Sequence, residues 1–447
     1  DTTVQTHELR INAPINDTMS LTAGAFFSDL ELLEHNMFTY PGSLVSDIGW
    51  GPNYALTDIS VTGVVLQGKS SENAGAGWHS GRGPYQAPVI FINDIKRTDK
   101  QQGFFGELSI DVSETSELTV GARWYDIEVD LEGSANSSFG TGFLGGRDQR
   151  DQQRFGTNLS QQFNGPGGSS GNPRLDAMDY PDKAETDGVI GKVTYSWNPS
   201  EDIMYYLTWS EGFRPGLLNR PAGSSNADGS YTVRPITDSD EVTNYEFGWK
   251  SILNNGQLRF NGSLFMVDIS GLQTTILDPA IANLFFSDNA ADAEITGLEG
   301  DFTYYPNVDG LMISGAFSML DTEITKSLTT ADVVAGNDLA FAPAMQGNIA
   351  IRKEWGMSSG NMGHFQGQLT WSDDSYSDII EPNKGKQASY SFMNLRAGIS
   401  NDMWLAEIYI DNVTDERAEI SNNFVFDRQR VAVIRPTTLG LRWKRNF

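Results

Sequence analysis

Apolar and polar residues alternate along this chain with a period of two, over segments of ten or more residues. Near the C-terminus, Leu439, Leu441 and Trp443 fall on one face, and Gly440 and Arg442 fall on the other. Successive side chains of an extended strand point to opposite faces, so this pattern gives each strand one apolar and one polar face. The alternation recurs upstream, and it predicts an all-β protein built from long, two-faced strands.

About fifteen segments show this alternation and define the strands that we expect. Their predicted bounds are residues 3–12, 20–32, 97–112, 117–131, 186–198, 202–214, 240–253, 257–270, 291–305, 310–325, 343–355, 364–377, 388–400, 403–415 and 432–447. Most are longer than the roughly 5–6 residues of a strand in a soluble protein. A strand tilted by about 45° crosses a membrane with about 9–11 residues, so these strands are long enough to span one.

The connections between these strands are alternately short and long. Short turns are expected at residues 13–19, 113–116, 199–201, 254–256, 306–309, 356–363 and 401–402. Longer loops are expected at residues 33–96, 132–185, 215–239, 271–290, 326–342, 378–387 and 416–431. Short turns at one end and long loops at the other are typical of a transmembrane antiparallel β-barrel, whereas soluble propellers and sandwiches use shorter strands.

The composition excludes several classes of function. The 31 Lys and Arg against 58 Asp and Glu give a net charge of −27. This balance argues against nucleic acid as a partner, because phosphate contacts need clustered basic residues. The chain has no Cys, which excludes disulfides, thiol catalysis and thiolate metal sites. No run of about 18 apolar residues occurs, so the sequence predicts no transmembrane helix.

Six regions of the sequence, in order, resemble the TonB-dependent outer-membrane receptor family. They are residues 6–11 with 21–27 (THELRI, LTAGAFF), 105–108 with 118–124 (FGEL, LTVGARW), 205–216 (YYLTWSEGFRPG), 241–250 (EVTNYEFGWK), 410–416 (IDNVTDE) and 435–447, which ends in an aromatic residue. Their order and spacing are more specific than any one of them, and together they cover essentially the whole chain.

The resemblance implies a barrel of about 22 strands with a plugged lumen, long extracellular loops and short periplasmic turns. On this expectation, residues 1–447 form the C-terminal part of such a barrel, about fifteen of its strands, and the plug domain and first strands have no counterpart in this sequence. A closed antiparallel barrel with both termini on one side needs an even number of strands. The sequence leaves open whether the barrel is truncated, is completed by another chain, or gains a strand at residues 59–66.

The resemblance also implies a function and a place in the cell. We expect a Gram-negative outer-membrane receptor for TonB-energised uptake of a scarce ligand, such as a ferric siderophore or another metal chelate. Its expected partners are outer-membrane lipid and lipopolysaccharide, the TonB complex acting through the plug, and the insertion machinery, which reads Phe447 as an assembly signal. The alternative is a passive pore or a structural barrel that works without a plug.

The first set of candidate ligand contacts lies around one expected loop. Arg214 ends a strand at the outer rim, and Arg220, Tyr231 and Arg234 lie in the loop that follows. Arg binds carboxylates through paired hydrogen bonds, so these residues are suited to an anionic ligand. The alternative for Arg214 is that it ties the strand end to neighbouring acids.

A second set of candidate contacts lies in the first long loop, which contains His35, His79 and Trp78. The histidines are candidates for contact with a metal chelate, and the indole for stacking on a sugar or an aromatic ligand. The alternatives are solvated loop histidines and an aromatic residue that packs the loop down.

The motifs of an enzyme or a cofactor-binding protein are missing from the sequence. The four histidines have no metal-ligand spacing, and no nucleophile elbow, P-loop or zinc motif occurs. We therefore expect no catalytic site, no bound metal and no cofactor. Two acidic clusters leave a calcium site open, although neither matches the EF-hand pattern: Ser287-Asp288-Asn289 with Asp292 and Glu294, and Asp373-Asp374 with Asp378.

Overall fold

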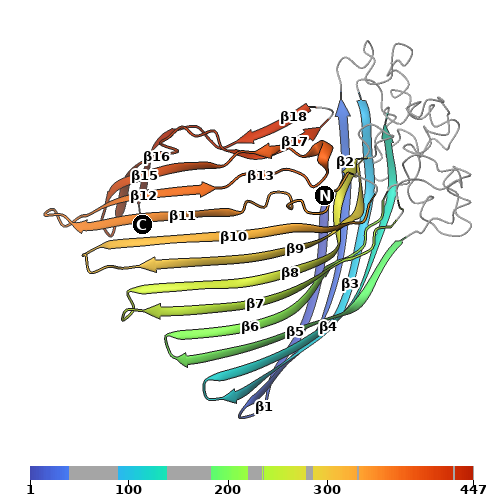
Figure 1. Cartoon of the computed structure of the whole chain (residues 1–447), viewed down its shortest axis with the longest axis horizontal. Coiled ribbons are helices and arrows are strands. Elements are labelled where there is room, and N and C mark those ends of the chain that lie inside the picture. The colour runs from blue at the N-terminus through green and yellow to red at the C-terminus, as the bar shows by residue number, and fades with distance from the viewer. Residues whose placement is uncertain are drawn as a thin grey trace, which may run out of the picture.

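The computed structural model describes residues 1–39, 89–137, 183–219, 234, 236–277, 285–329, 332–425 and 428–445. Over these residues the protein consists of one curved sheet of fifteen antiparallel strands and two small two-stranded sheets (Figure 1). The described residues also include a single-turn 3₁₀ helix, η3 (Glu381–Asn383). The predicted all-β antiparallel architecture is confirmed.

The fifteen strands of the main sheet run as a meander. They are β1 (Thr2–Asn16), β2 (Met19–Thr39), β3 (Val89–Ser113), β4 (Ser116–Ser137), β5 (Lys183–Ser200), β6 (Ile203–Arg214), β7 (Asp240–Leu253), β8 (Leu258–Leu277), β9 (Phe285–Tyr304), β10 (Leu311–Ser327), β11 (Met345–Gly356), β12 (Met362–Ser372), β15 (Tyr390–Ser400), β16 (Trp404–Asp411) and β19 (Thr438–Arg445). Each strand pairs with the next in this order, and β1 and β19 lie at the two edges.

Four short strands lie in connections at the long-loop end, where the sequence analysis needs correction. They are β13 (Ser375–Tyr376), β14 (Lys386–Gln387), β17 (Glu419–Val425) and β18 (Arg428–Val433). The expected loop at residues 416–431 is therefore largely a hairpin, and the expected last strand at 432–447 begins later, at Thr438. These short strands pair within loops, so they lack the long alternation on which the strand prediction rests.

The turns at the opposite end of the sheet have the predicted hairpin chemistry. Asn254, Asn255 and Gly256 all adopt left-handed backbone conformations, with φ of 52°, 56° and 87°. Asn and Gly tolerate this region better than other residues. At the turn before β16, the Asn401 side-chain oxygen accepts hydrogen bonds from the Met403 and Trp404 N–H groups, at 2.9 and 3.1 Å.

The part of the sheet near the short turns has one apolar and one polar face. On β7 and β8, Tyr245 lies opposite Met266 and Phe247 lies opposite Leu264, and all four side chains are 38–49% exposed. Similar exposed apolar side chains occur on the other strands and form a continuous apolar band. The opposite face of this zone carries mainly Gly, Ser, Thr, Asn and charged residues, together with aromatic side chains such as Tyr206 and Phe265.

Nearer the long loops, the alternation changes phase, as β4 shows most clearly. Between Leu118 and Trp124 the even-numbered residues are apolar, and Val120 and Trp124 are 43% and 37% exposed. From Tyr125 to Leu131 the odd-numbered residues are apolar instead, and they are only 3–7% exposed. The strand continues without a register shift across this point, so the apolar side chains move from one face of the sheet to the other.

Beyond the apolar band, the same face becomes acidic. Asp126 lies opposite Asp187, and Asp268 lies opposite Glu294, which in turn lies opposite Glu323. We call this set of side chains the acidic collar; it consists of Asp29, Asp126, Glu128, Asp187, Asp268, Glu294, Asp321 and Glu323. At the loop side, β2, β3 and β4 extend well past their predicted ends at residues 32, 97 and 131.

Two buried apolar clusters lie on the face opposite the collar. The wall cluster comprises Tyr125, Ile127, Val129 and Ala184, packed against Ile190, Phe213, Leu218 and Ile236. The mouth cluster comprises Ile276, Ala290, Ala291, Ile324, Val333, Ile379 and Ile380. The hydrophobic core among the described residues is therefore concentrated at the long-loop end of the sheet.

Candidate functional site

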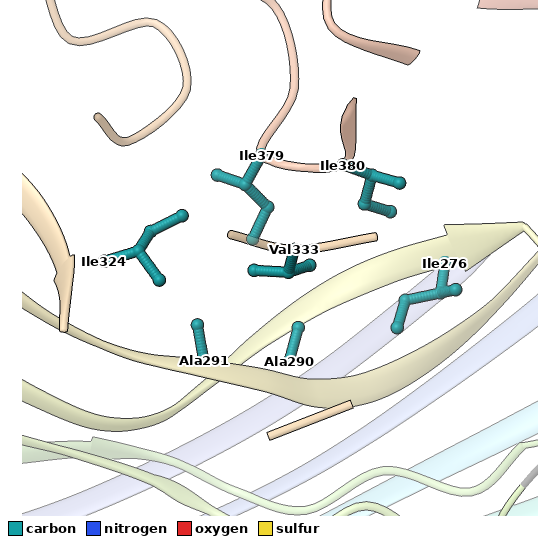
Figure 2. Close-up of a cluster of buried hydrophobic side chains, with 7 residues drawn as sticks. All are labelled: Ile276, Ala290, Ala291, Ile324, Val333, Ile379 and Ile380. Carbon is teal, nitrogen blue, oxygen red and sulfur yellow. The ribbon is translucent and has the colours of Figure 1, made fainter. Parts of the chain in front are cut away.

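Loop segments fold back onto the polar face of the sheet at its long-loop end and form the candidate site. Figure 2 shows Ile379 and Ile380, from the β13–β14 connection, beside Val333 and above Ala290 and Ala291 of β9. We call residues 332–344 and 373–389, with the strand ends beneath them, the mouth assembly. Its apolar core holds two separate loops against one wall.

Backbone hydrogen bonds fix the first loop of the mouth assembly on β10. Ile324 donates its N–H to the Asn337 carbonyl and accepts one from the Gly336 N–H, both at 2.8 Å. The buried Thr322 hydroxyl oxygen accepts the Leu339 N–H at 3.0 Å. Thr322 lies on the same face as the polar residues lower on β10, so this loop covers the interior side of the wall.

The second loop is bonded to the first. Val333 and Ile380 form an isolated antiparallel bridge, and the Asn337 amide donates to the Glu381 carboxylate at 2.6 Å. The Phe341 N–H donates to the Tyr376 carbonyl at 2.7 Å. These bonds make the two loops one unit.

Buried amides connect this unit to the β17–β18 hairpin. Asn422, 2% exposed, donates its amide to the Lys386 carbonyl at 3.3 Å. The Gln387 amide reaches the Glu419 carbonyl at 3.4 Å. Any side chain at Gly385 would lie about 2.9 Å from the Asn422 amide, so this close packing requires glycine.

Two carboxyl groups of the mouth assembly have pKa values that are shifted in opposite directions. Burial raises the pKa of the Asp378 carboxyl, although the Ile380 N–H donates to it at 3.0 Å. The Lys386 ammonium, 2.9 Å from Asp374, lowers the pKa of that carboxyl. In the second predicted acidic cluster, Asp378 is thus bonded to a backbone N–H and Asp374 is paired with Lys386.

The connection from β6 to β7 is held by three side-chain amides. The Asn219 amide donates to the Arg234 and Ser287 carbonyls at 2.9 and 2.7 Å. Asn289 accepts the Asp238 N–H at 2.8 Å and donates to the Asp238 carbonyl at 2.9 Å. The Gln273 amide donates to the Pro215 and Asp238 carbonyls, both at 3.0 Å. Both ends of this loop are therefore fixed to β8 and β9.

Arg214 pairs with a buried acid. Its Nε and Nη2 atoms both donate to Oδ2 of Asp240, the Nε bond at 2.7 Å, and its backbone N–H donates to Oδ1 at 3.0 Å. The Asp240 side chain is only 2% exposed, whereas that of Arg214 is 56% exposed. In this arrangement Arg214 ties the end of β6 to the start of β7, the alternative that the sequence analysis left open.

Arg234 lies 2.8 Å from Asp238 and 3.9 Å from Asp288. Burial raises the pKa of the Asp288 carboxyl, while Arg234 and the Asn289 N–H act in the opposite direction. In the first acidic cluster, Asp292 accepts the Gly271 N–H at 2.9 Å. Within the ranges that the structure describes, no group of three or more His, Asp or Glu side chains is arranged to hold a metal ion.

Of the remaining predicted ligand contacts, His35 alone lies among the described residues. His35 lies on β2 in register with Asp94 of β3, not in a loop, because β2 and β3 extend beyond their predicted ends. Arg220, Tyr231, His79, Trp78 and the C-terminal Phe447 lie outside the described residues. The sequence analysis missed the mouth assembly, for which the adjacent Ile379 and Ile380 in an otherwise polar loop were the available signal.

The interior wall near the short turns carries a row of polar side chains that includes the buried His364 and Glu407. His364, Gly398, Glu407 and Arg442 occupy successive opposite positions on β12, β15, β16 and β19. The His364 Nε2 lies 3.0 Å from the Glu407 carboxylate, and Arg442 lies 3.1 Å from the same carboxylate. A Cβ at Gly398 would lie 2.5 Å from the imidazole, so glycine lets His364 and Glu407 meet across the intervening strand.

Comparison with known proteins decides the family. A family model described as "TonB dependent receptor-like, beta-barrel" matches residues 2–413. The chain belongs to this family. The apolar band therefore faces lipid in the Gram-negative outer membrane, the polar face lines the lumen, and the long loops are extracellular. The expected fold class and location are confirmed, and family and fold are those of transport receptors rather than enzymes.

Solved receptors share this fold at low sequence identity. The ferric yersiniabactin uptake receptor FyuA from Yersinia pestis is 13% identical, with a TM-score of 0.67 over 100% of this chain and 54% of that one. The siderophore receptor PiuA from Acinetobacter baumannii is 15% identical, with a TM-score of 0.62 over 99% and 55%. The copper transporter OprC is 12% identical, with a TM-score of 0.62 over 100% and 56%.

The chain thus spans about half the length of the solved receptors that it matches. A search of curated proteins finds no significant match. Among the described residues, no helix has both the length and the apolarity that crossing a membrane demands.

Proposed function

We propose that this protein acts in TonB-energised uptake of a ferric siderophore or a related metal chelate across the outer membrane. The observation that carries the proposal is the family match over residues 2–413. Solved receptors of the same fold are named for ferric yersiniabactin, siderophore and copper transport, which supports a chelated metal as the ligand.

The mouth assembly supports a role in ligand capture. Its loops pack on the luminal wall at the extracellular end, where a ligand from the medium arrives first. A preorganised loop loses less conformational entropy on binding than a flexible one. Loops that are already folded at the extracellular end are suited to capture a ligand before uptake.

We further propose that residues 1–447 form the C-terminal part of the barrel of a longer receptor with a plug. Most of the side chains of β1 are exposed, and both β1 and β19 are edge strands of the sheet. An unpaired backbone group in lipid costs several kcal/mol, so both edges need partner strands. TonB would act through the plug, and Phe447 would serve the insertion machinery during assembly beside lipid and lipopolysaccharide.

Uptake of radioactive iron tests the proposed function directly. The full-length protein is expressed in cells that lack their own siderophore receptors, with and without TonB, and ferric chelates are supplied. We expect accumulation that requires both the protein and TonB. Accumulation that persists without TonB would instead support the passive pore, and a natural protein lacking a plug would support the same alternative.

A further inference from the structure

The lipid-facing side of the apolar band contains a groove. It has a volume of about 530 Å³ and crosses five neighbouring strands, from Val193 on β5 to Thr296 on β9. Four spacings of about 4.8 Å separate these strands, so the groove is roughly 19 Å long. Strands β5 to β9 lie away from the edge strands β1 and β19. Further strands at those edges, or a plug in the lumen, would therefore leave the groove open.

Aromatic rings define the two sides of the groove. On the periplasmic side, the Phe247 ring stacks on Tyr205, with 6.1 Å between the ring centres, and lies 6.3 Å from the Trp249 ring. On the extracellular side, Trp209 lies over Gly191, where a Cβ would come within 3.1 Å of the indole. Glycine thus lets the indole lie close to the sheet. The lining of the groove is almost entirely apolar.

The dimensions of the groove fit one lipid chain. A volume of about 530 Å³ over a length of roughly 19 Å leaves a cross-section of roughly 28 Å², too narrow for a helix, whose diameter is about 10–12 Å. One leaflet supplies about half of the 30 Å hydrocarbon core, so a lipid chain needs roughly 15 Å. Inside a membrane the gain from seating such a chain is dispersion contact and fit of shape, because lipid is already apolar.

The acidic collar lies directly above the groove and bears on the choice of headgroup. Asp268 lies two residues beyond Met266 on the lipid-facing side of β8, and Glu294 lies two residues beyond Thr296 on β9. The two carboxylates face each other across the strands. No Lys or Arg is among the described residues that line the groove. This arrangement attracts an ammonium group and repels a headgroup with net negative charge.

We propose that this groove binds one acyl chain of an ethanolamine phospholipid, with the ammonium group of the headgroup at Asp268 and Glu294. Like charges directly opposite each other destabilise a sheet, and an ammonium group between them offsets this repulsion. The proposal depends on the position of the apolar band in the outer membrane and is independent of the ligand that the receptor takes up.

Native mass spectrometry of the full-length protein in detergent tests the groove. The protein is mixed with equal amounts of phosphatidylethanolamine and phosphatidylglycerol that carry the same acyl chains, and the lipids that stay bound are counted. Val193→Trp and Thr296→Phe fill the groove from its two ends with apolar side chains. Ile351→Trp is the matched control, because Ile351 is an exposed apolar residue (49%) of β11 that does not line the groove.

We expect the wild type and Ile351→Trp to retain one phosphatidylethanolamine, with a preference of about fivefold over phosphatidylglycerol. Val193→Trp and Thr296→Phe should lose this lipid while they still migrate as folded barrels on unheated gels. If Val193→Trp does not fold, Thr296→Phe decides. Equal retention by the wild type and the folded groove variants overturns the proposal.

Charge variants test the choice of headgroup. Asp268→Asn combined with Glu294→Gln should retain a lipid but lose the preference for phosphatidylethanolamine. Asp29→Asn removes a charge from another part of the acidic collar, on β2, and should keep the preference. A wild type that retains phosphatidylglycerol as well as or better than phosphatidylethanolamine overturns the proposal. An unchanged preference in the Asp268→Asn and Glu294→Gln double variant also overturns it.

Discussion

The membrane-spanning and extracellular zones of the sheet use the same strands with opposite polarity. On β10, Ser318 and Ile324 lie on the same luminal face, six residues apart. Ser318 lies in the zone where the wall faces a polar lumen, while Ile324 is fully buried under the mouth assembly. On the other face, Met319 belongs to the apolar band and Asp321 to the acidic collar.

The comparison teaches that the surroundings on each side of a strand decide which face is apolar. Inside the membrane, lipid solvates the outer face and the lumen solvates the inner one. Above the membrane, water solvates the outer face. On the inner face, the burial of apolar surface under the folded loops stabilises the fold by about 25 cal/mol for each Å². The position where the phase changes on β4 and β10 therefore marks the outer border of the membrane on these strands.

The largest expected effect is a charge placed on the luminal face in the two zones. Ile324→Asp buries an unpaired carboxylate in the mouth cluster and should destabilise the mouth assembly by at least about 4 kcal/mol. Ser318→Asp, on the same face and strand, should change stability by less than about 1 kcal/mol. Hydrogen exchange of the loop amides and urea unfolding of the full-length protein measure both. Equal effects at the two positions would contradict the inversion of polarity.

On the outer face, a positive charge should have different effects on stability in the apolar band and in the acidic collar. Leu264→Arg on β8 places a charge in the apolar band and should cost about 2–4 kcal/mol. Asp268→Arg, four residues further on the same face, should be tolerated or even stabilising, because Asp268 lies opposite Glu294 in the acidic collar. Unfolding titrations in lipid vesicles measure the difference. A large loss at Asp268 would move the membrane border above the collar.

Arg214 and Arg234 allow an ion pair with a buried acid to be compared with an exposed ion pair. Arg214→Ala leaves the buried Asp240 carboxylate without its guanidinium partner and should cost about 2–3 kcal/mol. Arg234→Ala removes ion pairs to Asp238 and Asp288 from a half-exposed side chain and should cost less than about 1 kcal/mol. Urea midpoints of the two variants decide this. If ligand binding falls in Arg214→Ala while the midpoint is unchanged, Arg214 contacts ligand and the tie to Asp240 is secondary.

The smallest expected effect is a pH dependence of the mouth assembly. Because burial raises the pKa of Asp378, the folded loop binds this proton more tightly than the unfolded loop does. Stability should therefore fall as pH rises from the ordinary carboxyl value of 3.8 through the raised value. Hydrogen exchange of residues 373–384 should show better protection at mildly acidic pH than at neutral pH, and Asp378→Asn should reduce this difference.

Asp374 provides the control of opposite sign. Lys386 lowers its pKa, so its contribution is present above the ordinary value of 3.8 and is lost as pH falls through the lowered value. Asp374→Asn should thus leave the gain in protection at mildly acidic pH in place. If both substitutions abolish the gain, its origin lies elsewhere in the loop.

The sequence predicts the main sheet well because each strand repeats one local rule. Every one of the fifteen predicted strands corresponds to a strand of the main sheet, and Asn254, Asn255 and Gly256 form the expected turn. The candidate site was much harder to predict, because its residues become neighbours only through folding. Val333 and Ile380 are far apart in the chain, and neither belongs to a long alternating segment.

The sequence by itself determined the all-β class, the strand order, the membrane-facing residues and the family, since alternation and short motifs depend on local spacing. Only the tertiary structure decided that Arg214 pairs with the buried Asp240 and that Gly398 lets His364 reach Glu407. Each of these depends on side chains from segments distant in the chain. Their proximity is set by the register of the sheet and by the packing of loops on its wall, and no local pattern specifies either for a loop.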